Sequence, residues 1–574
     1  MTSSIVDADS VLAIDLGSAY TRALLFDMVE GHYHFIAVGT ARSTVNAPFR
    51  DAGECVHQAL DHLQEITGRV FTDKDASLIL PSKPDGSGVD RLVMTFSAGP
   101  ELRVVTAGLL PDVSLESARN LIRTTYGQVV EAIGLNDRRR TDARLDAILE
   151  AKPDLVILAG GTESGANRSV LKLAELVAMA CRVLPQDKRP QVLYAGNSVL
   201  AKKIKAGLEK YTRVHTAANV RPSVDVESLG AAEMELTKVV TELRGQQMGG
   251  FRSLAQVCSA PPLPNAHAFG RMIRFFSRLY DHSRGVLGVD VGAESTAVAA
   301  AQAGHLTVEV LPQGLGRAIL SMQAEEDLKE IIRFIPFSMT PNALRDYLYQ
   351  KSVTPAGIPM TEESLAVEQA VARQILRKGM QQLRERWDGR WMSFEPILAS
   401  GSVLARAATP AQSLMMLLDG LQPVGVTTLV IDPNGLAASL GAIAEVDRML
   451  PVQVMESGAF QVLGTVICPA SRAKAGTVIM NARLEMESGE EIRLQVKQGS
   501  LTQLPLQSGQ TARLHIDHLN RAELGARGQR VPSNYKVVGG LCGAVIDARG
   551  RPLPTSDDET KRIELLKKWS AALR

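Results

Sequence analysis

Two short segments of the chain carry an aspartate at the end of an apolar run, with a glycine two residues later. Residues 11–21 read VLAIDLGSAYT and residues 286–296 read VLGVDVGAEST, so the aspartates are Asp15 and Asp290. An aspartate at a strand end places a carboxylate at the edge of a sheet, where it can hold a hydrated magnesium ion. Glycine in the following turn lets backbone N–H groups approach phosphate oxygens closely. The pattern is therefore typical of a phosphate-binding loop.

These two segments begin an internal repeat of the chain. Five of eleven positions are identical without gaps, and Ile14 and Leu16 are replaced by the apolar Val289 and Val291. Each copy continues into a second apolar run, a Gly-His pair and a third run of strand type. We therefore expect each copy to form three strands joined by tight turns. One copy alone would suggest an ordinary hairpin turn, whereas the repeat favours duplicated phosphate loops.

Glycines and hydroxyl side chains beside the aspartates are the other candidates for phosphate binding. A glycine permits close backbone approach, and a serine or threonine supplies a hydroxyl group. The candidate nucleotide-binding residues in the two loops are Gly17, Ser18, Thr21, Gly292, Ser295 and Thr296. Two such loops facing each other across a cleft would hold a nucleoside triphosphate and magnesium between them.

Helical and strand-like patterns alternate between the two copies. A helical period runs from Ser114 to Gly134, and a strand at 155–159 leads through a Gly-Gly-Thr turn into another helix. This alternation predicts βαβ units with parallel strands. The turn residues Gly160, Gly161 and Thr162 form a possible anion site at a helix N-terminus. Close packing of helix on strand explains the two glycines equally well.

The duplicated loops resemble those of the superfamily that contains actin, the sugar kinases and Hsp70. Asp15 and Gly17 match the first phosphate motif of that superfamily, and Asp290 and Gly292 match the second. The resemblance implies an α/β fold built from duplicated actin-like (ribonuclease H-like) ATPase lobes.

Three further segments make the resemblance more specific. Residues 153–170, 191–197 and 397–443 look like the MutL or GlmL family, whose members are encoded beside adenosylcobalamin-dependent glutamate mutase. This family is unrelated to the mismatch-repair protein of similar name. The resemblance covers roughly residues 10–450 and implies a role in assembling or reactivating a cobalamin mutase, with ATP and Mg²⁺ as cofactors.

The resemblance also assigns roles to residues. It implies that Asp15 and Asp290 are the catalytic residues and hold magnesium, and that Asp290 also orients the attacking water. The adenosine-side glycine pair of the superfamily corresponds to Gly401-Ser402, in which the second glycine is lost. The second phosphate loop also departs from the family, because Ala293 and Glu294 follow its glycine. Ala293 narrows the backbone approach, and the Glu294 carboxylate would either repel phosphate or help to bind magnesium.

Domain borders follow from changes in pattern along the chain. We expect a first actin-like lobe with an inserted βαβ region at 1–240, a linker at 241–280 and a second lobe at 281–454. Beyond about residue 455, strict alternation such as that at 491–497 predicts a β-rich C-terminal domain. We expect this domain, 455–574, to fold independently and to recognise a partner.

Composition excludes several classes of protein. The chain has 574 residues and a net charge of +1, with 45% hydrophobic residues, so it should be globular and not attracted to nucleic acid or to a membrane surface. Its five cysteines are far apart, which suggests neither a disulfide framework nor a zinc site. We find no leader pattern in the first residues and no apolar run of about 20 residues, which predicts a cytoplasmic protein.

These observations leave three candidate functions. The first is an ATPase that acts as an accessory factor for an adenosylcobalamin-dependent mutase and couples hydrolysis to remodelling of that partner. The second is a small-molecule kinase of the same superfamily, and the third is a nucleotide-binding scaffold without turnover. The sequence does not identify the partner, the oligomeric state, the role of Glu294 or the ligand of the C-terminal domain.

Overall fold

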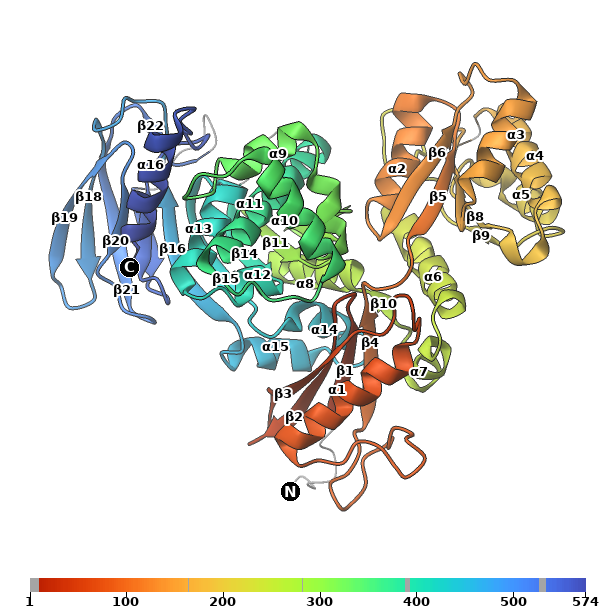
Figure 1. Cartoon of the computed structure of the whole chain (residues 1–574), viewed down its shortest axis with the longest axis horizontal. Coiled ribbons are helices and arrows are strands. Elements are labelled where there is room, and N and C mark those ends of the chain that lie inside the picture. The colour runs from red at the N-terminus through yellow and green to blue at the C-terminus, as the bar shows by residue number, and fades with distance from the viewer. Residues whose placement is uncertain (1–9, 164, 281, 388–392, 526–532, 574) are drawn as a thin grey trace.

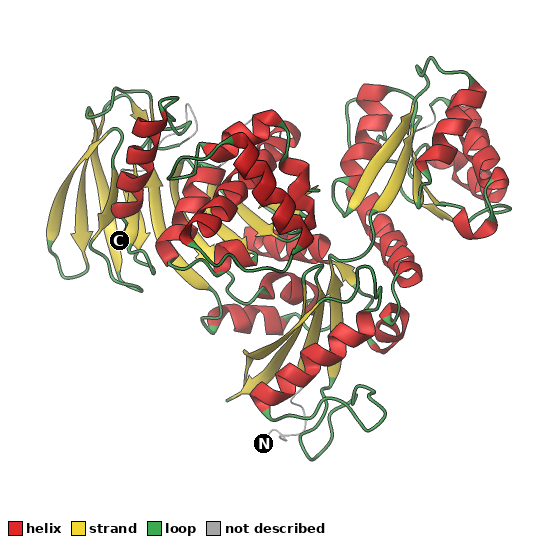
Figure 2. Cartoon of the chain, in the orientation of Figure 1, coloured by secondary structure: helices red, strands yellow, loops and turns green. Residues whose placement is uncertain are grey.

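The chain forms sheets covered by helices. A computed structural model describes residues 10–163, 165–280, 282–387, 393–525 and 533–573 (Figure 1). Within these residues the strands form an eight-stranded sheet, two five-stranded sheets, a four-stranded sheet and a two-stranded ribbon. Helices and strands alternate over most of the chain, and the C-terminal part is richer in strands (Figure 2). Most of the N-terminal segment in which a leader was sought lies outside the described residues.

The first copy of the repeat opens a five-stranded sheet. Its strands are β1 (Val11–Leu16), β2 (Tyr20–Val29), β3 (His32–Arg42), β4 (Arg91–Phe96) and β10 (Leu263–Pro264). The order is β10-β4-β1-β2-β3, in which β1, β2 and β3 are antiparallel neighbours while β4 runs parallel to β1 and β10 parallel to β4. Helix α1 (Ala52–Thr67) packs on this sheet through its buried face.

The second copy repeats this arrangement strand by strand. Its strands are β11 (Gly285–Val291), β12 (Thr296–Gln302), β13 (His305–Leu311), β14 (Phe394–Ser400) and β15 (Gly425–Ile431). The order β13-β12-β11-β14-β15 has the same antiparallel and parallel pairings as the first sheet. The predicted strand-turn-strand duplication, the α/β fold class and the β-rich C-terminal region are confirmed.

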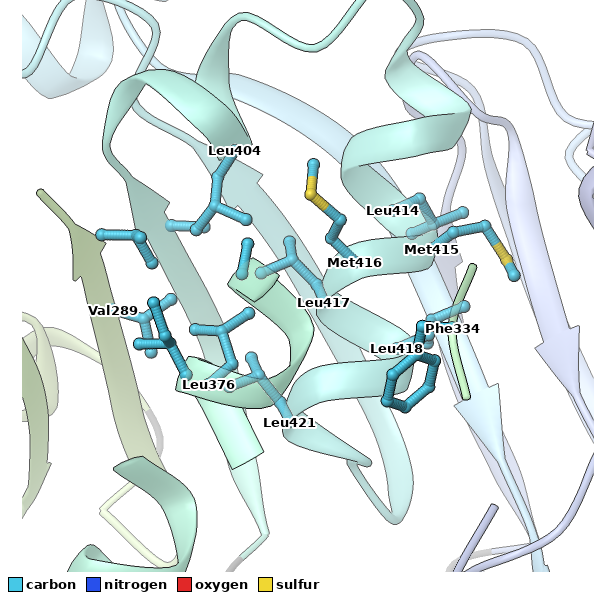
Figure 3. Close-up of a cluster of buried hydrophobic side chains, with 14 of the residues drawn as sticks. Val289, Phe334, Leu376, Leu404, Leu414, Met415, Met416, Leu417, Leu418 and Leu421 are labelled. Carbon is cyan, nitrogen blue, oxygen red and sulfur yellow. The ribbon is translucent and has the colours of Figure 1, made fainter. Parts of the chain in front are cut away.

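The helices of the second lobe form a large core on its sheet. They are α9 (Glu325–Ile332), α10 (Pro341–Val353), α11 (Glu362–Arg386), α12 (Ser402–Ala405) and α13 (Pro410–Leu421). Helix α15 (Met449–Glu456) packs instead on β3 of the first sheet and on α14. Figure 3 shows the apolar side chains of α13, including Met416 and Leu417, beside Leu376 of α11 and Val289 of β11. Helix α11 begins after Thr361, which caps it together with Ser364.

Two helices join the lobes. Helix α8 (Asn265–Leu279) follows the first sheet in sequence but packs on β11, β12 and β13, and α14 (Leu436–Ile443) packs on β1 and β4. The two helices also contact each other, so one apolar core runs between the lobes. Gly441 is required for this contact, since a Cβ there would overlap the backbone of Ala268.

An inserted unit interrupts the first lobe. Its strands are β5 (Leu102–Ala107), β6 (Gly127–Ile133), β7 (Leu155–Leu158), β8 (Gln191–Tyr194) and β9 (Val214–Thr216), all parallel, in the order β6-β5-β7-β8-β9. Helices α3 (Thr141–Ala151), α4 (Asn167–Val183) and α5 (Ala201–Leu208) cover one face, and α2 (Glu116–Ile122) and α6 (Gly230–Gln247) cover the other. The βαβ wiring is as predicted.

Two sequence expectations about local structure are wrong. The helical period expected from Ser114 to Gly134 ends at Ile122, because the β-branched residues after Gly127 form β6 instead. The expected linker at 241–280 is ordered into the end of α6, α7 (Phe251–Val257), β10 and α8. The prolines at 261, 262 and 264 are typical of a loop. The segment that follows them, however, is the amphipathic helix α8, which is buried between the lobes.

The border expected at residue 455 does not coincide with a break in the second sheet. Strand β16 (Gln461–Cys468) pairs antiparallel with β15, and β24 (Ala544–Asp547) and β20 (Leu501–Leu504) extend the same sheet. The other strands are β18 (Val478–Met486), β19 (Glu491–Lys497), β21 (Thr511–Leu519) and β23 (Asn534–Val538) in a four-stranded sheet, and β17 (Ala470–Ser471) with β22 (Ala522–Glu523). The alternation of polar and apolar residues correctly predicted strands in this region, but it did not predict which sheet each strand joins.

Buried ion pairs also tie the C-terminal region to the second lobe. The Arg549 guanidinium lies 2.8 Å from Asp419 of α13 and 2.8 Å from Asp547 at the end of β24. Burial works to raise the pKa of Asp547, but Arg549 and Arg551 outweigh it and hold this pKa well below its usual range. The terminal helix α16 (Glu559–Ala571) covers these ion pairs, and the centre of its Trp569 ring lies 5.0 Å from the guanidinium carbon of Arg549.

None of the described helices is long and apolar enough to cross a bilayer. The exact residues at which one domain ends and the next begins remain predictions from the sequence.

Acid should weaken the joint between the lobes through His267 of α8. Burial, with Arg271 and Arg274 nearby, lowers the pKa of His267 from 6.5 to about 4, against the opposing charge of Glu445. The unfolded chain therefore binds a proton at a higher pH than the folded chain, so stability falls as pH drops below 6.5 and levels off near 4. From about pH 7 to about pH 5 we expect a loss of about 2 kcal/mol in the free energy of unfolding.

Urea unfolding at both pH values measures this loss, with His267→Gln as the control. The glutamine variant lacks the titrating group and should lose correspondingly less stability than the parent. Equal losses in parent and variant would assign the acid sensitivity to other groups.

Candidate functional site

One cavity lies between the two phosphate loops. It has a volume of about 90 Å³ and is lined by both lobes and by α8. Seven predicted site residues line it: Asp15, Gly17, Ser18, Asp290, Gly292, Gly401 and Ser402. Residues separated by 275 or more positions in the repeat are thus brought to one place by the packing of the two sheets.

Glycine is required in the turns around this cavity. A Cβ at Gly17 would overlap the carbonyl of Tyr20, and a Cβ at Gly292 would lie 2.8 Å from the carbonyl of Ser295. Gly401 has φ +96° and a Cβ there would overlap the backbone of Val291. Each glycine therefore lets a loop fold tightly at a strand end, and the backbone lines the cavity.

Asp15 is held by three neighbours. Its Oδ1 accepts hydrogen bonds from the Thr95 hydroxyl at 2.9 Å and from the Asn265 amide at 3.1 Å. An Arg22 guanidinium nitrogen lies 3.7 Å from the other carboxylate oxygen. Asp15 is almost fully buried, so these contacts fix the direction of its carboxylate.

Asp290 has the same backbone position and a different environment. In the sheets, Asp15 pairs with Thr95 on β4, and Asp290 pairs with Ser400 on β14. Within the described residues, however, no donor hydrogen-bonds the Asp290 carboxylate. Burial raises the pKa of Asp290 to about 7, opposed by Arg22 and reinforced by Asp15 and Asp432. Asp290 is therefore the carboxylate in this cavity that most lacks a counter-charge.

Two further residues were not predicted: Arg22, which lines the cavity, and Asp432, whose charge acts on Asp290. Arg22 lies across the β1–β2 hairpin from Asp15 and reaches Gly435, where any Cβ would overlap its guanidinium. The backbone N–H groups of Leu436 and Ala437 donate to Asp432 at 2.9 and 2.8 Å. Burial raises the pKa of Asp432, and these donors at the N-terminus of α14 oppose the rise.

A signal for each of these two residues was present. Arg22 is the one basic residue of a largely apolar strand, seven positions after the aspartate of the repeat. The second copy has Ala297 at that position, so comparison of the copies hid it. Asp432 ends a strand and precedes a Pro-Asn-Gly turn into a helix, which is the pattern of a helix cap.

Three predicted nucleotide-binding residues do not line the cavity. Tyr20 and Arg22 of β2 line it, so Thr21 points to the opposite face of the sheet, where its hydroxyl bonds Cys55 Sγ at 3.1 Å. The Thr296 hydroxyl donates to the carbonyl of Gln313 at 2.9 Å, away from the cavity. Ser295 contributes its carbonyl to the turn by accepting the Gly292 N–H at 3.0 Å.

The two residues by which the second loop departs from the family, Ala293 and Glu294, lie differently with respect to the cavity. Ala293 lines the cavity, and its carbonyl accepts the Gly316 N–H at 2.7 Å. Glu294 does not line it. Burial raises the pKa of Glu294, while Arg317 and the backbone N–H groups of Arg317 and Ala318 oppose the rise. The Glu294 carboxylate is thus turned toward the start of the 3-10 helix Arg317–Met322 and not toward phosphate.

The Gly160-Gly161-Thr162 turn lies in the inserted unit, on a sheet separate from the cavity. A Cβ at Gly161 would lie 3.2 Å from the Cβ of Asn197, and one at Gly160 would lie 3.0 Å from Leu109. Close packing therefore requires these glycines. The nearby Glu163 carboxylate accepts hydrogen bonds from Ser198 and Asn219 and would oppose a bound anion.

The donor set fits a magnesium ion that is shared with a nucleotide. Among the described residues no three histidine, cysteine or acidic side chains converge into a ready-made metal cluster. Magnesium usually keeps several waters and takes one or two carboxylates together with substrate phosphates. Asp290, which is partly buried and has no hydrogen-bond donor among the described residues, and the fixed Asp15 supply such carboxylates on opposite lobes.

Comparison with known proteins gives one family. The family model described as MutL protein matches residues 11–458. A relative named Protein MutL, from Clostridium tetanomorphum, is 22% identical over 391 residues, which cover 64% of this chain and 76% of the relative.

Solved structures with related folds are more distant. A diol dehydratase-reactivating factor in nucleotide-free form has a TM-score of 0.30 at 10% identity, covering 76% of this chain and 99% of that chain. A xylulose kinase from Bifidobacterium adolescentis has a TM-score of 0.30 at 13% identity, covering 80% and 96%. A nucleotide-free acetone carboxylase has a TM-score of 0.34 at 12% identity, covering 86% and 81%. We draw no functional conclusion from structural similarity at these TM-scores.

Proposed function

Because the chain belongs to the MutL protein family, we propose that it is an ATP-dependent accessory factor for an adenosylcobalamin-dependent mutase of the glutamate mutase type. Nucleotide binding is supported by one observation: two loops, each with an aspartate and a glycine and each from a different lobe, line the same cavity. The mutase partner is inferred from family membership and from the sequence segments that resemble the family.

In this proposal the chain's own residues bind and orient the nucleotide. The loop backbones at Gly17 and Gly292 approach the phosphates from opposite sides, and Arg22 offsets their charge. Magnesium, when bound between Asp15 and Asp290, would neutralise charge on the transferred phosphate. Asp290 orients the attacking water and accepts its proton, because its carboxylate lines the cavity and has no hydrogen-bond donor of its own among the described residues.

Hydrolysis is coupled to a change in shape. The cavity of about 90 Å³ has room for phosphate groups, whereas pockets for whole ligands measure about 300–1,000 Å³. In this proposal the lobes separate to admit the complete nucleotide and close again around it. Such hinge motion would change the surface presented to a partner.

Replacing Gly17 with alanine tests whether the first loop binds phosphate. The added Cβ would overlap the Tyr20 carbonyl, so the turn must shift, and we expect the affinity for Mg-ATP to fall at least about tenfold. The matched control is Gly207→Ala in α5, where nothing lies within 4 Å of the new Cβ. Titration calorimetry of both variants measures the change; equal affinities would remove the first loop from the site.

The accessory role is separated from its two alternatives by phosphate release with and without a glutamate mutase. An accessory ATPase releases phosphate and does so faster with mutase inactivated during turnover. A kinase transfers phosphate to an added small molecule, and a scaffold releases none. Turnover that needs a small-molecule acceptor would reject the proposal in favour of a kinase.

A further inference from the structure

One segment of the inserted unit contacts both the second lobe and helix α8, which joins the lobes. It runs from Arg123 to Tyr126, between α2 and β6. The Arg123 carbonyl accepts the N–H of Val310 on β13, in the second lobe, at 2.7 Å. The Tyr126 hydroxyl accepts the N–H of Ala266, in the first turn of α8, at 2.7 Å. In Figure 1 the inserted unit stands apart from the second lobe over most of its length, and these two hydrogen bonds join it to β13 and α8.

The contact at Ala266 is one residue from the nucleotide site. The first N–H groups of a helix have no acceptor within the helix, and Ala266 is fully buried, so the tyrosine hydroxyl supplies the acceptor that this group needs. The preceding residue, Asn265, donates through its side chain to Asp15 at 3.1 Å. Tyr126 thus fixes the end of α8 from which Asn265 directs the Asp15 carboxylate.

The surrounding interface is polar and charged. Glu309 of β13 is fully buried and pairs with Arg386 at 2.6 Å, but its Oε2 has no hydrogen-bond partner among the described residues. Burial raises the pKa of Glu309, and Arg386 and Arg123 oppose the rise. Polar contacts of this kind permit movement more readily than large apolar ones. An apolar core joins the inserted unit to α6 and the first lobe, so movement would occur at the β13 contact and would reach Tyr126 there.

We propose that Tyr126 is a positioning residue through which the orientation of the inserted unit sets the direction of the Asp15 carboxylate in the nucleotide cleft. This inference rests on the proposed function, because it assigns regulation to the same site. A partner that docks on the inserted unit would change turnover without touching nucleotide. The route consists of Tyr126, the first turn of α8, Asn265 and Asp15.

The test is Tyr126→Phe, which removes only the hydroxyl oxygen. We expect kcat for ATP hydrolysis to fall about tenfold, as is common when a partner of a metal ligand is removed, with KM for Mg-ATP changed less than about twofold. The loops that bind ground-state phosphate remain, whereas the carboxylate is misdirected as charge develops. The matched control is Tyr194→Phe in β8 of the same unit, which loses a hydrogen bond of 2.8 Å to the carbonyl of Asn197, far from the cleft.

Hydrogen exchange keeps this test apart from that of the proposed function. The Ala266 amide should exchange faster in Tyr126→Phe than in the parent and at the parental rate in Tyr194→Phe, with or without nucleotide. Equal effects of the two substitutions on kcat, or an unchanged Ala266 amide, would overturn the positioning role. If the parent itself failed to bind Mg-ATP, the proposed function would fall, and faster exchange in Tyr126→Phe would still support the contact.

Discussion

Asp290→Asn should reduce magnesium-dependent ATP turnover at least about 100-fold, the usual size of a lost general-base contribution. The asparagine keeps the shape of the side chain, so the loop around Gly292 should hold and ATP should still bind. What is lost is the negative charge that organises metal and water while charge develops on phosphate. Phosphate release and calorimetry on the same preparation separate turnover from binding.

Stability provides a second readout for this substitution. The Asp290 carboxylate is partly buried and has no hydrogen-bond donor among the described residues, so the neutral asparagine should leave the apo protein at least as stable as the parent. Asp432→Asn is the matched comparison, because both oxygens of Asp432 accept backbone N–H groups at the start of α14. It should lower the melting temperature. Parental turnover in Asp290→Asn would remove this residue from the catalytic role.

A chain that ends at Ser457 should fail to fold. The truncation removes β16 and leaves the backbone groups of β15 unpaired along one edge. It also removes part of the second lobe's core, namely Leu463, Val466, Cys468, Leu501, Cys542, Val545, Leu553, Trp569 and Leu573. Since burial of one large apolar side chain contributes about 1.5–3 kcal/mol, the loss exceeds the stability of an ordinary domain.

Co-expression makes the truncation experiment specific. A separate fragment of residues 458–574 can restore the missing strands, so we expect the two pieces together to be soluble and each piece alone to aggregate. A soluble truncated chain that binds Mg-ATP with the affinity of the parent would contradict this expectation. It would restore the sequence-based expectation of an independent recognition domain.

The sequence predicted the two loops of the site because a reactive residue pattern, Asp-X-Gly, recurs at the end of a strand-like apolar run. The repeat at residues 11–21 and 286–296 located both lobes and both acidic loops, because a duplicated motif leaves the same residues at the same turns. It misplaced Thr21, since adjacent residues of a strand face opposite sides and the neighbours Tyr20 and Arg22 take the cavity side. A motif gives the residues of a loop but not the face that each one presents.

Contacts made across the chain could not be found in this way. Asn265 bonds Asp15 from 250 positions away, and Tyr126 bonds the adjacent residue of α8 from another unit of the fold. Neither residue lies in a motif, because each is defined by how the helix between the lobes is placed. The extension of the second sheet by β16 was hidden for a similar reason, since alternation predicts a strand but not its neighbour.

The account depends on one property of the chain, which is magnesium-dependent binding of ATP between the lobes. Titration calorimetry of the purified full-length chain with ATP, in the presence of Mg²⁺ and again with the metal chelated, tests it directly. We predict saturable binding of about one ATP per chain with magnesium and clearly weaker binding without it, because the two loops bring carboxylates as well as backbone to the phosphates. Absence of binding with magnesium present would contradict the account.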